Sequence, residues 1–155
     1  MSDTLELAPD FTLPVKGGDH SEISLSGLRG TPFVLFFYPR DDTSGCTKEN
    51  EDFTALEGEF AQIGVKVFGI SKDSLESHEK FMAKKKLTVP LISDEHGTAS
   101  EDFGVWQEKS MYGKKFMGIE RSTFLIDAEG RIAKAWRKVK VPGHAEEVLE
   151  AAKAL

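Results

Sequence analysis

The chain contains a single cysteine, Cys46, at a position where a thiol could act as a nucleophile. It stands among the polar residues Thr43, Ser44 and Thr47, after a loop that contains a proline and at the expected start of a helix. A helix N-terminus presents amide groups without partners and a partial positive charge, and both favour a thiolate. Cysteines in such positions have pKa values lowered from about 8.5 into a range of about 3.5 to 7.5. The position therefore indicates a reactive thiol, whereas a lone cysteine elsewhere is more often buried and inert.

A low pKa by itself makes a thiol only a few-fold more reactive. For a thiol whose pKa falls to about 6, the thiolate fraction at pH 7 rises about 30-fold, but intrinsic nucleophilicity falls about tenfold. A fast reaction therefore also needs fixed hydrogen-bond donors that face the charge developing on the leaving atom. Thr43 offers a hydroxyl from the same loop, and the amide of Cys46 is a donor in the first helical turn. An arginine would complete such a site.

The loop around Cys46 resembles the active-site motif Pro-x-x-x-Thr-x-x-Cys of the peroxiredoxins, in their bacterioferritin comigratory protein (PrxQ) subfamily. The matching residues read Pro39-Arg-Asp-Asp-Thr43-Ser-Gly-Cys46-Thr-Lys-Glu49. Two later segments also resemble the subfamily, namely Gly118-Ile-Glu-Arg-Ser-Thr-Phe-Leu-Ile-Asp127 and Lys138-Val-Lys-Val-Pro-Gly-His144. The matches occur in order and span nearly the whole chain, so the resemblance is specific.

The resemblance implies a role for each matching residue. Cys46 would attack hydrogen peroxide or a small alkyl hydroperoxide and become a sulfenic acid, while Pro39 would shield the pocket and Thr43 would hydrogen-bond the peroxide. Arg121 would hold the thiolate and the peroxide oxygens, and Glu49 would orient that arginine. From its position alone, Arg121 is only a basic residue ahead of a strand, of the kind that usually lies in solvent.

Members of this subfamily often carry a second, resolving cysteine, either five residues after the nucleophile or in the following helix. This chain has Glu51 at the first of these positions, and Met82 is the expected counterpart at the second. We therefore expect a one-cysteine mechanism. An external thiol, from thioredoxin, glutaredoxin or glutathione, would reduce the sulfenic acid through a mixed disulfide. The implied reaction needs no metal and no organic cofactor, and the four histidines lie in separate segments without the spacing of metal ligands.

Two other classes of function stay open at this point. A redox sensor or thiol-dependent binding module would use oxidation of Cys46 as a signal, and the missing resolving cysteine favours this interpretation. A structural adaptor would keep Cys46 inert. Turnover with excess reductant distinguishes the enzyme from the sensor, because a sensor would stop after one oxidation. The pH dependence of Cys46 alkylation distinguishes both of them from the adaptor.

Hydrophobic patterning predicts the elements that position Cys46. Phe33–Tyr38 and Val65–Ile70 are nearly continuous apolar runs, as expected for strands of a parallel sheet that are buried on both faces. Asp73 and Glu76 have the spacing of a helix start, which predicts a helix over residues 74–86. Between the two strands, a helix that starts near Cys46 is predicted by an apolar stripe consisting of Phe53, Leu56, Phe60 and Ile63.

The remaining pattern predicts the fold class. Ser122–Ile126 and Arg131–Trp136 flank Asp127-Ala-Glu-Gly130, which suits an antiparallel hairpin, and a last helix is predicted after Pro142-Gly143. The predicted elements follow the order of an α/β, thioredoxin-like fold with a mixed central sheet flanked by helices. This order is strand, helix, strand, then helix, hairpin and helix. Without repeats or linkers, residues 1–155 are predicted to form a single domain. The fold does not by itself settle the chemistry.

Composition narrows the range of partners. The chain has 39% hydrophobic and 30% charged residues, which is close to average, with a net charge of −6 and a pI near 5.3. This charge would repel a phosphate backbone, so we expect no nucleic-acid partner, and the basic run Lys84-Lys85-Lys86 is interpreted as the solvated end of a helix. The pattern of a signal peptide or membrane span is not found, so a cytoplasmic protein is expected. We expect a monomer and leave a dimer open.

Overall fold

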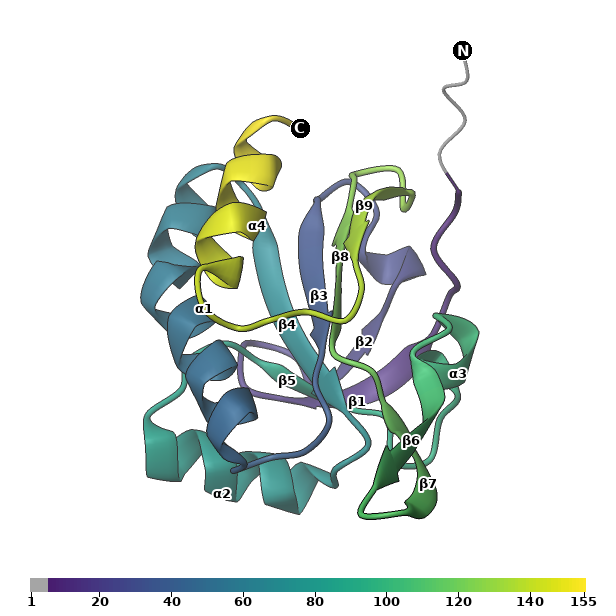
Figure 1. Cartoon of the computed structure of the whole chain (residues 1–155). Helices are drawn as coiled ribbons and strands as arrows, with labels where there is room; N and C mark the ends of the chain where they lie inside the picture. Colours follow the sequence, from purple (N-terminus) through teal and green to yellow (C-terminus); the bar gives the residue numbers. More distant parts are fainter. Residues whose placement is uncertain (1–5) are drawn as a thin grey trace.

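The computed structural model describes residues 6–155. In this part of the chain, a mixed seven-stranded sheet has the order β2-β1-β5-β4-β3-β8-β9, and β6 and β7 form a separate two-stranded sheet (Figure 1). The strands are β1 (Thr12–Lys16), β2 (Glu22–Ser24), β3 (Phe33–Phe37), β4 (Lys66–Ser71), β5 (Leu91–Ser93), β6 (Trp106–Met111), β7 (Lys114–Ile119), β8 (Ser122–Ile126) and β9 (Ile132–Trp136). The helices are α1 (Ser44–Gln62), α2 (Leu75–Lys85), α3 (Ala99–Asp102), α4 (His144–Lys153) and the 3-10 turn η1 (Ser26–Leu28).

The predicted fold class is confirmed. Strand β3 pairs in parallel with β4, and β4 with β5, whereas β8 pairs antiparallel with both β3 and β9. Helices α1 and α4 lie side by side against one face of this sheet (Figure 1). This is the mixed sheet with flanking helices of a thioredoxin-like fold.

Strand β3 is the buried centre of the molecule, as its apolar run predicts. Its five residues are all buried, because each face of the strand packs against its own apolar cluster. Val34 and Phe36 face the helices, and Phe36 stacks on Phe53 of α1 with ring centroids 4.4 Å apart. Strand and helix are thereby fixed relative to each other. The loop that joins them, residues 38–43, is held at both ends.

Helix α1 confirms the predicted helix, although the apolar stripe is shorter than expected. Phe53 and Phe60 are buried and Leu56 is partly buried. The prediction that Ile63 continues the stripe is wrong, because this residue is 39% exposed. The helix ends at Gln62, so the helical spacing no longer decides which way the Ile63 side chain points.

Helix α2 is confirmed, but its predicted cap at Asp73 is off by one residue. Ser74 is the N-cap, and its side chain accepts a hydrogen bond from the Ser77 amide over 3.1 Å. Asp73 stands one residue ahead of the cap, and its Oδ2 instead accepts from the Asp41 amide and from the Ser71 hydroxyl. Lys84 and Lys85 lie in the last turn of this helix, which agrees with the interpretation of the basic run.

The predicted hairpin and last helix are both confirmed. Asp127 accepts hydrogen bonds from the amides of Glu129 and Arg131 across the turn, and Gly130 adopts a φ of +83° that favours glycine. Helix α4 then buries Ala145, Val148, Leu149 and Ala152 against the sheet side of the molecule.

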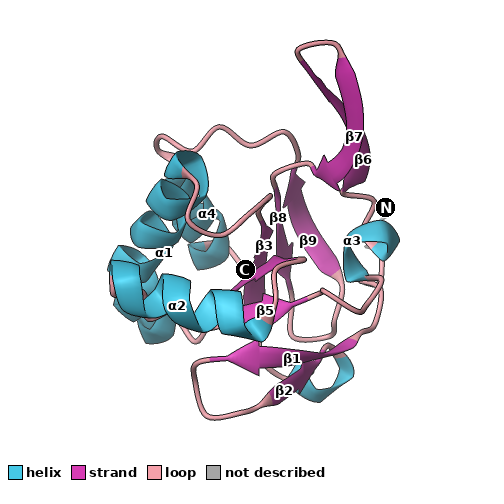
Figure 2. Ribbon diagram, turned by 90° about the horizontal axis from the view of Figure 1, so that it is seen from below, coloured by secondary structure: helices cyan, strands magenta, loops and turns pink. Residues whose placement is uncertain are grey.

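Several elements have no counterpart in the prediction. Strands β1, β2 and β5 and helix α3 are only three to five residues long, too short for periodicity to identify them. The β6–β7 hairpin projects from the body of the molecule (Figure 2), so most of its residues are exposed and its strands lack an alternating apolar pattern. Its turn at Tyr112-Gly113 has φ values of +54° and +78°, as the tightest hairpin turns require.

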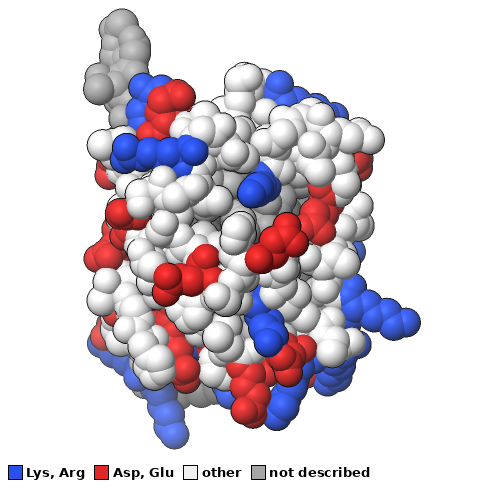
Figure 3. Space-filling view, turned by 180° about the vertical axis from the view of Figure 1, so that it is seen from behind, with Lys and Arg blue, Asp and Glu red and all other residues white. Residues whose placement is uncertain are grey.

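The molecular surface carries mixed charge. On the face in Figure 3, Lys and Arg side chains are interspersed with Asp and Glu and do not gather into a basic stripe. The expectation that the chain does not bind nucleic acid stays a prediction. Among the described residues, no helix is both long and apolar enough to cross a membrane.

Candidate active site

Cys46 lies where the end of β3 passes into the first turn of α1. Its side chain is buried, with 0% exposure. The first hydrogen bond of the helix runs from the Thr47 amide to the Thr43 carbonyl over 2.8 Å. The amides of Gly45 and Cys46 therefore have no carbonyl one turn earlier in the helix to bind, and they give this end of α1 a partial positive charge.

Arg121 reaches this turn from the other half of the chain. The β3–β8 register places Phe37 opposite Ser122, so Arg121 stands beside the end of β3. Its Nη2 donates to Cys46 Sγ over 3.4 Å, and its Nη1 donates to Glu49 Oε1 over 2.6 Å. One guanidinium thus contacts both the thiol and a carboxylate. Burial alone would lower the pKa of Arg121, but Glu49 and Cys46 outweigh it and raise that pKa above its ordinary value.

Gly45 makes room for this arginine. A Cβ at position 45 would lie 3.1 Å from Arg121 Nη2, a distance shorter than most real Cβ contacts, so the guanidinium would have to move by a few tenths of an ångström. The hydrogen atom of a glycine leaves that space to the guanidinium. The glycine ahead of Cys46 is therefore part of the geometry that brings Arg121 to the sulfur, a role that its sequence position did not indicate.

Glu49 is a buried carboxylate with an incomplete set of partners. Burial raises its pKa to about 7, against the opposing effect of Arg121. Glu49 Oε1 accepts from Arg121, while Oε2 is buried without a hydrogen-bond partner among the described residues. The neighbouring Asn50 donates to the Cys46 carbonyl over 2.9 Å. Glu49 therefore changes charge near neutral pH, in direct contact with the guanidinium that touches the thiol.

Thr43 and Pro39 lie in the loop between β3 and α1. Pro39 is half-buried and Thr43 is exposed. The Thr43 hydroxyl donates to the Arg40 carbonyl over 3.1 Å rather than capping the helix with its side chain. Of the five residues predicted from the sequence, the structure brings Cys46, Glu49 and Arg121 into direct contact and places the other two in the adjoining loop.

Lys109 of β6 is a nearby cation that sequence reasoning missed. Its pKa is lowered by burial and by repulsion from Arg121, while Cys46 acts in the opposite direction. Its Cδ lies 3.3 Å from where a Cβ of Gly118 would stand, so the missing side chain of Gly118 leaves room for the lysine methylenes. No sequence signal identifies it, because the exposed hairpin has no periodic pattern.

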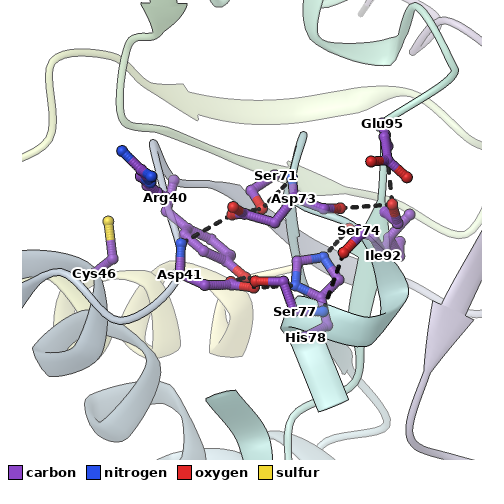
Figure 4. A network of polar contacts seen from close by, with 12 residues as sticks. Arg40, Asp41, Cys46, Ser71, Asp73, Ser74, Ser77, His78, Ile92 and Glu95 are labelled. Carbon is purple, nitrogen blue, oxygen red and sulfur yellow. Dashed lines mark hydrogen bonds and ion pairs between the residues drawn. The ribbon is translucent and has the colours of Figure 1, made fainter. Parts of the chain in front are cut away.

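A second polar cluster, also missed, lies behind the Cys46 loop and is shown in Figure 4. Ligand atoms of Asp41, Asp73 and His78 lie within 4.8 Å of one another, which is close enough for a metal ion. Asp41 Oδ2 and Asp73 Oδ2, however, already accept hydrogen bonds, and the His78 ring nitrogens lie within hydrogen-bond distance of Asp41 and Ile92. The cluster is thus satisfied internally, and the expectation of no metal site stays a prediction.

A family model described as "AhpC/TSA family" matches residues 5–135 of the chain. The chain is 48% identical over 151 residues to "Peroxiredoxin Bcp" of Xanthomonas campestris, covering 97% of this chain and 94% of that protein. It belongs to the peroxiredoxins of the AhpC/TSA family. This peroxiredoxin is also 48% identical over 147 residues to "Peroxiredoxin Bcp" of Bacillus subtilis, covering 94% of this chain and 92% of that protein. The resemblance to the bacterioferritin comigratory protein (PrxQ) subfamily is confirmed, and the protein is a peroxidase.

Solved structures agree with this assignment. A Xanthomonas campestris bacterioferritin comigratory protein superimposes with a TM-score of 0.89 at 46% identity, covering 99% of this chain and 98% of that one. That structure was described for the alkyl peroxide reduction activity of the Xanthomonas campestris protein, from its trapped intermediate/ligand complex. "Peroxidoxin BcpB" of Mycobacterium tuberculosis gives a TM-score of 0.83 at 35% identity, over 98% of this peroxiredoxin and 97% of its own chain.

Proposed function

We propose that this peroxiredoxin reduces hydrogen peroxide and small alkyl hydroperoxides with Cys46 as the attacking nucleophile, and that an external thiol completes the cycle. The contact of 3.4 Å between Arg121 Nη2 and Cys46 Sγ is the observation that carries the proposal, because it places a fixed cation beside the thiol at a helix N-terminus. The alkyl peroxide reduction named for the Xanthomonas campestris relative supports the substrate class.

In the first half-reaction, the Cys46 thiolate donates an electron pair to the terminal oxygen of the hydroperoxide. An S–O bond forms while the O–O bond breaks, so Cys46 is oxidised to sulfenic acid and the peroxide is reduced. The departing oxygen leaves with the electron pair of the O–O bond and takes a proton from solvent, giving water or an alcohol. Arg121 and the first-turn amides of Gly45 and Cys46 face the negative charge that develops.

Thr43 has a specific part in orienting the peroxide. Because its single hydroxyl proton is donated to the Arg40 carbonyl, the Thr43 oxygen is left to accept a hydrogen bond from the O–H of the hydroperoxide. Pro39, half-buried in the same loop, limits the access of water to the sulfur. Glu49 keeps Arg121 in place through the contact of 2.6 Å.

In the second half-reaction, a thiol of thioredoxin, glutaredoxin or glutathione attacks the sulfenic sulfur and releases water, and a second thiol then frees Cys46 by reducing the mixed disulfide. The chain itself has no other cysteine to do this. Cys46 is 0% exposed, so a bulky thiol reaches it only after the loop or the first turn of α1 moves. Residues 1–155 act as a single domain in this cycle, and the chain works as a monomer in the cytoplasm.

Stopped-flow mixing with hydrogen peroxide tests the proposal. The wild type should be oxidised rapidly at Cys46, whereas Cys46→Ser should not react, and a wild-type rate no higher than that of free cysteine would sink the idea. Coupled assays that offer thioredoxin, glutaredoxin and glutathione in turn identify the reductant.

A redox sensor is the second candidate function. The burial of Cys46 and the lack of a second cysteine favour it, since both slow the return of the thiol. Turnover with excess reductant decides between the two, because a sensor would stop after a single oxidation with all three thiols.

A further inference from the structure

The side chain of Asp41 is buried in hydrogen bonds that join the Cys46 loop to helix α2 (Figure 4). The Tyr38 hydroxyl donates to Asp41 Oδ1 over 2.6 Å, and the Ser77 hydroxyl donates to Asp41 Oδ2 over 2.7 Å. His78 Nδ1 lies 2.8 Å from the same Oδ2, and His78 is 0% exposed. The Tyr38 bond thus closes the loop on itself, and the other two bonds tie it to two consecutive residues of α2.

The hydrogen-bond partners of His78 fix its protonation. Nε2 lies 2.9 Å from the carbonyl oxygen of Ile92, which can only accept, so Nε2 carries a hydrogen. An unprotonated Nδ1 would then set its lone pair against a carboxylate oxygen of Asp41. The distance of 2.8 Å therefore requires a proton between Nδ1 and Oδ2, as in a buried imidazolium and carboxylate pair.

Two other titratable groups face this pair from the neighbouring elements. Burial raises the pKa of Tyr38, and Asp41 raises it further, so the Tyr38 hydroxyl keeps its proton and remains a donor. Asp73, ahead of α2, accepts from the Asp41 amide over 2.8 Å and from the Ser71 hydroxyl over 2.6 Å. Strand β5 contributes the carbonyl of Ile92 and the hydroxyl of Ser93, which donates to the Asp73 carbonyl over 2.6 Å. The proton shared by Asp41 and His78 is thus the one whose loss would change this network.

We propose that Asp41 and His78 are a positioning pair. By sharing one proton, they hold the segment 38–43, and with it Cys46, in the geometry for peroxide attack. This role rests on the proposed function of Cys46. Within the segment, Asp42 has a φ of +61°, a left-handed conformation that is uncommon outside glycine but that aspartate adopts more readily than most residues. A second tie to α2 is the ion pair of 2.7 Å between Asp42 and Lys84. Loss of the contact of 2.8 Å between Asp41 and His78 removes a tie to α2 and releases the segment.

The two half-reactions respond to this release in opposite ways. Peroxide attack depends on the closed arrangement, in which Arg121 lies 3.4 Å from Cys46 Sγ. Reduction by an external thiol depends on exposure of a sulfur that the closed arrangement buries completely. A weaker pair should therefore slow the first half-reaction and accelerate the second, which a loss of stability alone would not do.

The experiment uses the full chain and two variants that act differently on the proton. Asp41→Asn leaves a buried imidazole without its counter-charge, and should slow oxidation by hydrogen peroxide about tenfold to a hundredfold while accelerating reduction of the Cys46 sulfenic acid by dithiothreitol. His78→Gln keeps a hydrogen-bond donor but loses the positive charge, and should change both rates in the same directions as Asp41→Asn by smaller factors. Asp94→Asn is the matched control, because Asp94 is a buried carboxylate bonded to the amides of Ala99 and Ser100, away from the loop. It should lower stability and leave both rates unchanged.

If the wild type reacts rapidly while Asp41→Asn and His78→Gln keep both of its rates, the pair is merely structural and the inference is wrong, although the proposed function stands. A wild type that reacts no faster than free cysteine overturns both. Should the variants not fold, ¹⁵N NMR of wild-type His78 decides the matter. Two protonated ring nitrogens at the pH of maximal activity support the pair, and a single protonated nitrogen overturns it.

Discussion

Arg121 lies directly over Gly45, with its Nη2 3.1 Å from the point where a Cβ of residue 45 would stand. The same nitrogen donates to Cys46 Sγ. The approach of the guanidinium to the sulfur therefore depends on the absence of a side chain one residue ahead of the cysteine.

Gly45→Ala should displace Arg121 from Cys46. We expect oxidation by hydrogen peroxide to slow about tenfold or more, as is usual when a catalytic group is misplaced by a fraction of an ångström to 1 Å. Gly58→Ala is the control on the same helix, since a Cβ there meets nothing within 4 Å. It should leave the rate unchanged and stabilise the helix by about 0.5 to 1 kcal/mol. Equal rates in the two variants would contradict the role given to Gly45.

Arg121→Lys keeps the charge but loses the guanidinium, whose two terminal nitrogens contact Glu49 and Cys46 at the same time. We expect peroxide attack to slow about tenfold to a hundredfold, while the pH dependence of Cys46 alkylation changes much less. Stopped-flow oxidation and iodoacetamide alkylation measure the two effects. Equal losses in both would mean that Arg121 acts only as a charge.

Glu49 should make stability depend on pH. Burial raises its folded pKa to about 7 from an ordinary value of 4.5, so between these pH values the folded chain holds a proton that the unfolded chain releases. Stability is therefore fully present below pH 4.5 and falls as the pH rises towards 7, by about 3 kcal/mol for this group. Urea unfolding at a series of pH values should show this slope in the wild type and a flatter one in Glu49→Gln. A slope unchanged in Glu49→Gln would refute the assignment.

Lys109→Met should slow peroxide attack a few-fold, because it removes a cation that interacts with Cys46. The substitution should not lower stability, since burial and Arg121 both disfavour the charged form of this lysine, as its lowered pKa indicates. Lys115→Met, on the exposed face of the neighbouring strand, is the control and should leave the rate as it is. Thermal unfolding and stopped-flow oxidation are measured for both variants. A rate of Lys109→Met equal to that of Lys115→Met would mean that Lys109 does not belong to the site.

Patterns within one segment predicted the parts of the fold that neighbouring residues determine. Phe33–Tyr38 is a short apolar run rich in β-forming residues, which indicates a strand buried on both faces, and Cys46 follows it at the start of a helix. The hairpin around Asp127 and Gly130 was readable for the same reason, since a tight turn uses particular residue types. The β6–β7 hairpin was not, because exposed strands carry no apolar alternation.

By itself, then, the sequence determined a thioredoxin-like chain with one cysteine at a helix N-terminus, and the motif around Cys46 identified the family. Only the tertiary structure decided which groups surround the sulfur. Arg121 is 75 residues from Cys46 along the chain and reaches it because the β3–β8 register sets Phe37 opposite Ser122. His78 and Asp41 likewise meet across 37 residues. Propensity and periodicity act between near neighbours, whereas contacts at such separations follow from strand register and helix packing, which belong to the folded chain as a whole.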